Sequence, residues 1–281
     1  MAICRRALRS GEPSLARGMR EADVTQPDLA QPDPPGSVEL WFVDLNSCAE
    51  ALNAVETATP RLAKNELKKI AGSASSAAAA ERRAAYIALR ILIERFWGPA
   101  WRTVAYTLTG SGKPMLTGLG GSFSLAHVDR FALIGLARAR TIGVDLEPDR
   151  QPTVADRRRG RIESAAIALA RGAALPQPRQ PRFLQAWVRL EAVAKADGRG
   201  IGRLLTGLGI IGPDPADGPD FNVDYAHDIA TRFWVQDVAV SNGCVAAVAL
   251  DDELPASTAA QLLPSQAQAI ETLVSSTQTQ S

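Results

Sequence analysis

The sequence predicts an α+β fold of two pseudo-symmetric lobes, each a small antiparallel sheet packed with a long helix. Two observations favour this class. The segments FALIGLARARTIGVDLE and FWVQDVAVSNGCVAAVAL both read as hairpins of apolar strands, and each follows a segment with helical character. A chain of 281 residues with 46% hydrophobic residues is also large enough to bury two modest cores.

Composition and charge narrow the class of protein. The 31 lysines and arginines nearly balance the 30 acidic residues, so the chain lacks the strong positive charge of a general nucleic-acid binder. Its three cysteines lie far apart in no metal-like spacing, which favours a reducing compartment. No apolar run approaches the roughly 20 residues of a membrane span. We therefore expect a cytoplasmic protein that binds neither nucleic acid nor membrane.

Four regions are expected along the chain. Residues 1–36 end in the proline-rich stretch QPDLAQPDPPG and are expected to form a disordered leader. The N-terminal lobe is expected over residues 37–147 and the C-terminal lobe over residues 148–254. Residues 255–281 are rich in Gln, Ser, Thr and Ala, and are expected to form a disordered tail. Two lobes in one chain can build a whole cleft, so we expect a monomer.

In the first lobe, VELWFVDL (38–45) reads as a strand and NELKKIAG (65–72) as a short helix. After the joint SASSAAAA, apolar residues at three- and four-residue spacing from Glu81 predict a helix that ends at Gly98. In the second lobe, irregular structure with one weak helix is expected over 149–180. A strong helix, RFLQAWVRLEAVAKADG, then follows Pro181, and a glycine closes it.

The stretch TIGVDLE carries two carboxylates on an apolar strand. Asp145 and Glu147 are two positions apart and share one face, while Val144 and Leu146 point to the opposite, buried face. Neighbouring like charges disfavour each other. A solvated strand face and a divalent metal site both explain the pair, and the strand alone leaves the choice open.

A helical stripe supplies a third carboxylate. Trp187, Glu191 and Lys195 are spaced i, i+4 and i+8, so they lie on one side of the predicted helix. An exposed Glu–Lys pair is the ordinary interpretation, but the tryptophan and the following DGRGIG favour a ligand site. Together with Asp145 and Glu147, the glutamate would offer magnesium the oxygen ligands that this ion prefers.

Four motifs in this order, GKPML, FSLAH, IGVDLE and WVRLEAVAKADGRG, resemble those of the 4'-phosphopantetheinyl transferase superfamily, in particular its two-lobed monomeric type. Members typically show a G-K-P loop, an F-N-x-S-H segment, a G-V/I-D-V/I-E strand and a W-x-x-K-E-A/S-x-x-K-x-x-G helix. The resemblance runs from about Val38 to Leu250. It implies magnesium-dependent transfer of the phosphopantetheine arm of coenzyme A to a serine of an acyl or peptidyl carrier protein, which releases adenosine 3',5'-bisphosphate.

The resemblance also implies roles for single residues. Asp145, Glu147 and Glu191 would bind magnesium. Glu191 and Lys195 would be catalytic, the glutamate as general base for the serine hydroxyl and the lysine facing the diphosphate of coenzyme A. The residues that would bind coenzyme A are Lys113, Pro114, Ser124, His127 and, by a looser match, Arg83 or its neighbour Arg82. A basic or apolar surface within 149–180 is the expected landing site of an acidic carrier protein.

Two positions depart from the family pattern. Leu190 stands where the family usually has lysine, and Arg189 lies about 100° away around the helix. Ala126 replaces the serine expected before the histidine. Two alternatives follow: a non-catalytic relative, weakened by Leu190, that binds coenzyme A or a carrier protein, and a magnesium-dependent phosphohydrolase. The second explains the acidic residues but not the ordered GKP and tryptophan motifs.

Overall fold

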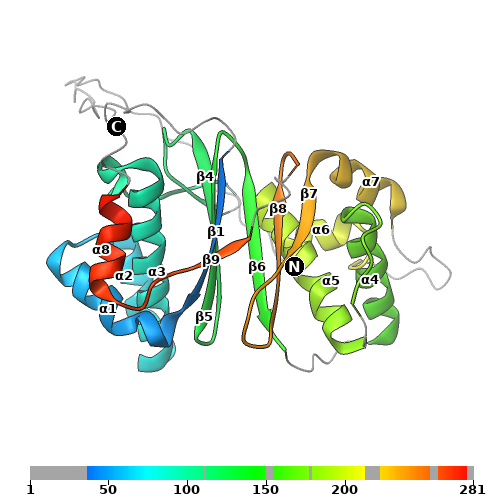
Figure 1. Cartoon of the computed structure of the whole chain (residues 1–281). Coiled ribbons are helices and arrows are strands. Elements are labelled where there is room, and N and C mark those ends of the chain that lie inside the picture. The colour runs from blue at the N-terminus through cyan, green and yellow to red at the C-terminus, as the bar shows by residue number, and fades with distance from the viewer. Residues whose placement is uncertain are drawn as a thin grey trace, which may run out of the picture.

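The computed structural model describes residues 37–110, 112–149, 155–176, 179–212, 222–253 and 259–276. These residues form the predicted mixed α+β class, with eight α-helices and three small sheets. Figure 1 shows four layers: one group of helices, a first sheet, a second sheet that faces it, and another group of helices. No helix within the described ranges is long and apolar enough to cross a bilayer. The predicted disordered leader, residues 1–36, lies outside the described residues.

The first sheet has four strands in the order β4-β5-β1-β9. Strand β1 (Val38–Asp44) pairs antiparallel with β5 (Phe131–Arg138), which pairs in turn with β4 (Gly121–Val128). Strand β9 (Ala260–Leu262) joins the other edge of β1 in parallel. The helices on its outer side are α1 (Leu45–Ala58), α2 (Lys64–Ala71), α3 (Ser76–Trp97) and α8 (Ala267–Ser275).

The second sheet has three antiparallel strands in the order β6-β8-β7. They are β6 (Ile142–Pro148), β8 (Cys244–Leu250) and β7 (Trp234–Val238), and the predicted hairpin of β7 and β8 is confirmed. The helices on its outer side are α4 (Asp156–Leu169), α5 (Arg179–Asp197), α6 (Ile201–Gly207) and α7 (Val223–Arg232).

A two-stranded hairpin presents the GKP loop. Strands β2 (Thr107–Leu108) and β3 (Pro114–Met115) pair antiparallel, after the 3-10 helix η1 (Pro99–Trp101). The Thr109 N–H donates to the Lys113 carbonyl at 2.9 Å, and the Lys113 N–H donates to the Thr109 hydroxyl at 3.0 Å. These two bonds fix the backbone of the lysine.

Three apolar cores hold the layers together. One lies between the first sheet and its helices, and another lies between the second sheet and its helices. The third fills the space between the two sheets, and its members include Phe42, Leu133, Val144, Leu146 and Val248. Val144 and Leu146 are thus buried on the face opposite Asp145, as the alternation of residues predicts.

The predicted hairpin of residues 131–147 is wrong, because its two strands belong to different sheets. Strand β5 pairs with β1 and β4, whereas β6 pairs with β8. The two strands face each other instead: a Cβ on Gly135 would lie 2.7 Å from Ile142 Cδ1. The predicted lobe boundary after residue 147 therefore assigns β6 to the wrong sheet.

The predicted disorder of residues 255–281 is also wrong where that region is described. Strand β9 extends the first sheet, and α8 packs on α1 and α3. Ile270 and Val274, four positions apart, are buried in the first core, and the Cys48 thiol donates to the carbonyls of Leu263 and Pro264. The polar composition of this region masked the apolar stripe of α8 that Ile270 and Val274 form. Residues 254–258 and 277–281 lie outside the described residues.

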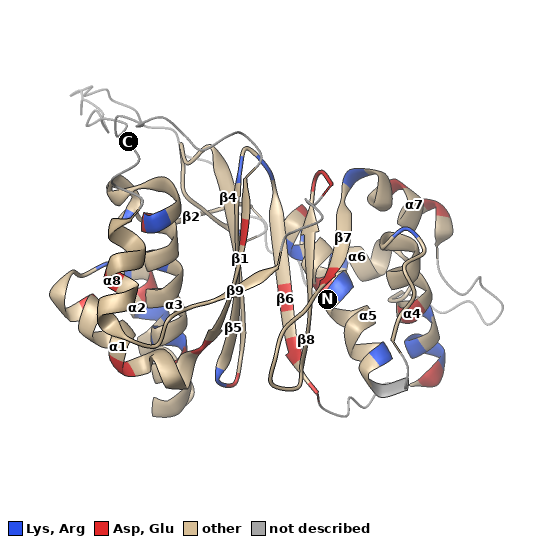
Figure 2. Ribbon diagram, viewed as in Figure 1, with Lys and Arg blue, Asp and Glu red and all other residues tan. Residues whose placement is uncertain are grey.

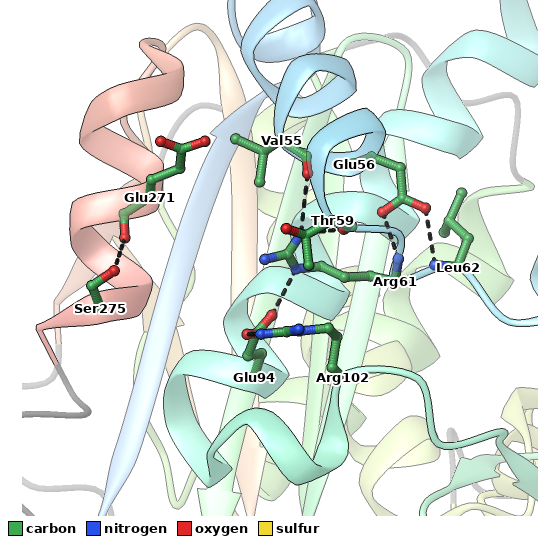
Figure 3. Close-up of polar contacts among 9 residues, drawn as sticks. All are labelled: Val55, Glu56, Thr59, Arg61, Leu62, Glu94, Arg102, Glu271 and Ser275. Carbon is green, nitrogen blue, oxygen red and sulfur yellow. Dashed lines mark hydrogen bonds and ion pairs between the residues drawn. The ribbon is translucent and has the colours of Figure 1, made fainter.

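Buried ion pairs tie α3 to the chain on either side of it (Figure 3). The Glu94 carboxylate is fully buried and accepts from Arg61 Nε at 2.7 Å and from Arg102 Nε at 2.9 Å. Glu56 accepts from the backbone N–H groups of Arg61 and Leu62 at 2.9 and 3.1 Å. A buried carboxylate is costly unless it is paired, so these contacts hold the α1–α2 connection in one place against α3.

We expect Gly143→Ala to lower the free energy of unfolding by about 1–3 kcal/mol. A Cβ there would lie 2.1 Å from the Ala192 carbonyl oxygen and 2.3 Å from the Ala196 nitrogen, so β6 or α5 would have to shift. Gly160→Ala is the matched control, because a Cβ at this position in α4 meets nothing within 4 Å and alanine favours a helix. Urea unfolding measures both variants, and equal stability changes would contradict the close approach.

Candidate functional site

Six of the nine predicted site residues line one cavity of about 360 Å³. It is built by α2, α3, the GKP loop, β4 and the C-terminal half of α5, with the residues that follow α5. The six residues are Lys113, Pro114, Ser124, His127, Glu191 and Lys195. Segments that are far apart in the sequence therefore meet at one place.

The same cavity is lined by residues that the sequence did not single out. They include Glu66 and Lys69 of α2, Tyr86 of α3 and Tyr106. Arg90 contacts two of them: its Nε donates to both Glu66 carboxylate oxygens at 3.0 Å, and its guanidinium lies 3.9 Å from the centre of the Tyr106 ring. No local sequence pattern reports such an arrangement, because the Arg90 pairing joins two helices and a loop.

The two carboxylates of β6 lie next to this cavity. Asp145 Oδ1 accepts from Lys195 Nζ at 2.7 Å. The other oxygen, Oδ2, is buried, and no group in the described part of the chain donates to it. Burial raises the pKa of Asp145, the Lys195 ammonium opposes this rise, and the Glu147 charge adds to it. Asp145 and Glu147 thus share one face of β6, as predicted, and Asp145 is buried.

Glu191 is electrostatically coupled to both strand acids. Burial and the charge of Asp145 raise the pKa of Glu191 to about 7, with Glu147 adding to the rise and Lys195 opposing it. A carboxylate with a pKa near neutral pH can take up and release a proton under physiological conditions, as a general base must.

The carboxylate oxygens of Asp145, Glu147 and Glu191 are the type of ligand that magnesium prefers, but the three side chains do not converge on one point in the described part of the chain. Asp145 Oδ2 is buried and has no hydrogen-bond partner among the described residues, and hard divalent cations take carboxylate ligands. Among the residues that the structure describes, no group of three His, Cys, Asp or Glu side chains is arranged to hold a metal ion. Joint ligation by Asp145, Glu147 and Glu191 would require them to approach one another more closely, and the magnesium set stays a prediction.

Lys113 reaches from the GKP loop across to the second sheet. Its Nζ donates to the Ile142 carbonyl of β6 at 3.3 Å and to the Ala196 carbonyl of α5 at 3.0 Å. Burial lowers the pKa of Lys113 to about 8, against the opposing charges of Asp197 and Asp251. The ammonium has three donors, so one remains for a ligand in the cavity.

The two candidate arginines of α3 lie differently. Arg82 donates to the Lys69 carbonyl and to the Ser73 hydroxyl, and its charge, after burial, helps to lower the pKa of His127. Arg83 donates to the Asn53 side chain of α1 and does not line the cavity. The arginine whose charge reaches the cavity is therefore Arg82.

Leu190 and Arg189 both point away from the cavity. Leu190 is fully buried in the core formed by the second sheet and its helices. Arg189 is also buried, and its guanidinium donates twice to Asp237, each time at 2.7 Å. Neither side chain supplies the cation that the family pattern leads one to expect beside Glu191.

The cavity as a whole brings cations and carboxylates together in one place. Lys69, Lys113 and Lys195 come from three different elements, and Glu191 lies among them. Compared with protein-family models and with curated proteins, the chain matches none. The function of the site therefore has to be inferred from its residues and from the order of its motifs.

Lys113 predicts a change of stability with pH. Its pKa of about 8 in the folded protein lies below the usual 10.5, so burial of the ammonium costs stability fully below pH 8. Between pH 8 and about 10.5 the unfolded chain binds more protons, and the cost is relieved. Relative to Lys113→Met, the wild type should therefore gain stability from pH 8 to pH 10 in urea unfolding. Parallel stability curves would show that the lysine is not desolvated.

Leu190→Lys tests whether this position has access to the cavity. We expect a loss of stability on the order of 3 kcal/mol, because the leucine is fully buried and a lysine would carry an unpaired charge into an apolar core. Leu190→Met keeps the volume and should cost less than about 1.5 kcal/mol. The variants are compared by urea unfolding at pH 7, and a stable Leu190→Lys protein would mean that the new side chain escapes to the cavity.

Proposed function

We propose that the protein transfers the 4'-phosphopantetheine arm of coenzyme A to a serine of an acyl or peptidyl carrier protein. The observation that carries this proposal is the convergence on one cavity of Lys113, Pro114, Ser124, His127, Glu191 and Lys195, which are the residues that the family resemblance assigns to coenzyme A and to catalysis. A phosphohydrolase needs the acids but does not need this combination.

The residues of the cavity have complementary tasks in such a transfer. The Lys195 ammonium would bind and orient the diphosphate of coenzyme A, and Lys113 would contact its 3'-phosphate end, since phosphoryl transfer depends mainly on positioning and charge neutralisation. The carrier serine oxygen attacks the phosphorus that bears the pantetheine arm, and its proton passes to the Glu191 carboxylate. The phosphoanhydride bond breaks, and adenosine 3',5'-bisphosphate leaves with the bond's electron pair.

Magnesium is the cofactor of this proposal, with Asp145, Glu147 and Glu191 as its ligands. The chemistry that the bound ion supplies is neutralisation of charge on the diphosphate oxygens. The proposal also includes the finer features of the family: a pseudo-symmetric two-lobed plan, a monomeric state and a cytoplasmic location. An acidic carrier protein would land near α4, whose Arg157 and Arg158 lie in an exposed stretch (Figure 2).

Asp145→Ala tests the function directly. The purified protein is incubated with magnesium, coenzyme A and an acidic apo-carrier protein, and mass spectrometry follows the addition of one phosphopantetheine arm to the carrier. We expect the variant to lose transfer by on the order of a hundredfold or more, because a buried acid beside the diphosphate is removed. Glu50→Ala, which removes an exposed acid of α1, is the matched control.

The outcomes separate the candidate functions. Carrier modification by the wild type and by Glu50→Ala, but not by a folded Asp145→Ala protein, supports the proposal. Full transfer by Asp145→Ala would contradict the metal assignment. Binding of coenzyme A or carrier without transfer, across several carriers, would favour a non-catalytic relative. Release of phosphate from coenzyme A without any carrier would favour a phosphohydrolase.

A further inference from the structure

The outer edge of β6 is closed by side chains instead of by a neighbouring strand. Strand β6 is the edge of the second sheet and β4 is the edge of the first, and the two lie in contact. The Ile142 N–H donates to Ser122 Oγ at 2.7 Å, and the Val144 N–H donates to Ser124 Oγ at 3.1 Å. Ser122 and Ser124 are two positions apart on β4, and Ile142 and Val144 are two positions apart on β6. Two serines on one face of β4 therefore accept hydrogen bonds from alternate N–H groups of β6.

The two serines differ in what their hydroxyl hydrogens do. Ser122 Oγ accepts from Ile142 and also donates to the Arg140 carbonyl at 2.9 Å, so its hydrogen is already used. Ser124 Oγ accepts from Val144, and among the described residues the Ser124 hydroxyl donates no hydrogen bond. Ser124 lines the cavity, whereas Ser122 does not. Its unused donor is therefore available to an oxygen acceptor of a ligand in this cavity.

Val144 directly precedes Asp145, so the hydrogen bond that the Val144 N–H donates to Ser124 fixes the strand at the position of the first acid. Close packing leaves the strand little freedom elsewhere: a Cβ on Gly143 would lie 2.1 Å from the Ala192 carbonyl oxygen. A buried N–H that loses its acceptor is costly, so the strand is held where Ser124 stands. Any movement of that hydroxyl is passed on to Asp145 through one peptide unit.

We propose that Ser124 is a positioning residue that couples ligand binding in the cavity to strand β6. Its oxygen holds the Val144 N–H, and its hydrogen donates to a phosphate or another oxygen acceptor of the ligand. A ligand bound there stiffens the segment that carries Asp145 and Glu147. This coupling rests on the proposed function only in taking coenzyme A as the ligand, because the serine bond to β6 is a feature of the fold itself.

Amide hydrogen exchange resolved by residue, measured by NMR, tests the coupling in the wild type, Ser124→Ala and Ser122→Ala. Without ligand, Ser124→Ala should speed exchange at Val144 roughly five- to tenfold, and Ser122→Ala should do the same at Ile142, since each loses one hydrogen bond. Saturating coenzyme A, without magnesium, should slow exchange at Val144 in the wild type and in Ser122→Ala. In Ser124→Ala at saturation, this protection should be absent.

Two results would overturn the proposal. One is unchanged Val144 exchange in ligand-free Ser124→Ala, and the other is equal protection of Val144 by coenzyme A in Ser124→Ala and the wild type. If Ser124→Ala is unstable, the wild type alone still decides the coupling, because coenzyme A must protect Val144 more than Ile142. Failure of the wild type to bind coenzyme A would instead contradict the proposed function, and the ligand-free exchange rates would then decide the positioning role.

Discussion

Strand β6 has to fit between two neighbours that leave it almost no clearance. On one face its Gly143 touches the backbone of α5, and on the other its Ile142 and Val144 side chains lie against Gly135 of β5. This double contact brings Glu191 and Lys195 of α5 within reach of Asp145 and brings the first sheet beside the cavity. The interaction between the sheets is therefore what assembles the site, because Asp145 and Glu147 lie on β6, Glu191 and Lys195 on α5, and Ser124 and His127 on β4.

The same packing explains why the acids of β6 can be tolerated. The apolar face of the strand is buried in the core between the sheets, which contributes roughly 25 cal/mol for each Å² of apolar surface removed from water. The cost of burying the Asp145 charge is partly offset by the Lys195 ammonium at 2.7 Å. The pKa of Glu191 is raised to about 7, so this side chain need not add a third buried charge. Stability and chemistry thus depend on one set of contacts.

Much of this site could be predicted from local patterns, and the errors concern contacts between distant segments. The alternation in TIGVDLE located β6, and the spacing of Glu191 and Lys195 placed them on one side of α5. The partner of β6 could not be found in this way, since β8 lies about a hundred residues later in the chain. Helix α1 was missed although Asp44 caps it and Leu45, Cys48 and Leu52 repeat at helical spacing. Lys69 of α2 and Tyr86 of α3 line the same cavity, and the Arg90–Glu66 pair that joins these two helices is not visible in any local pattern.

At Leu190 the motif alone leads to the wrong expectation about the cavity, because the direction of the side chain depends on tertiary packing. Its departure from the family pattern suggests a missing cation beside Glu191, but the side chain is buried in the core formed by the second sheet and its helices, so the departure changes packing there. The positive charge of the cavity is supplied by Lys69, Lys113 and Lys195, which belong to α2, to the GKP loop and to α5. Because these lysines come from both sides of the sheet interface, an anionic ligand would be bound by both halves of the molecule at once. Loss of one cation from α5 would then weaken the binding of the ligand by one half of the molecule, while the cations of the other half would still bind it.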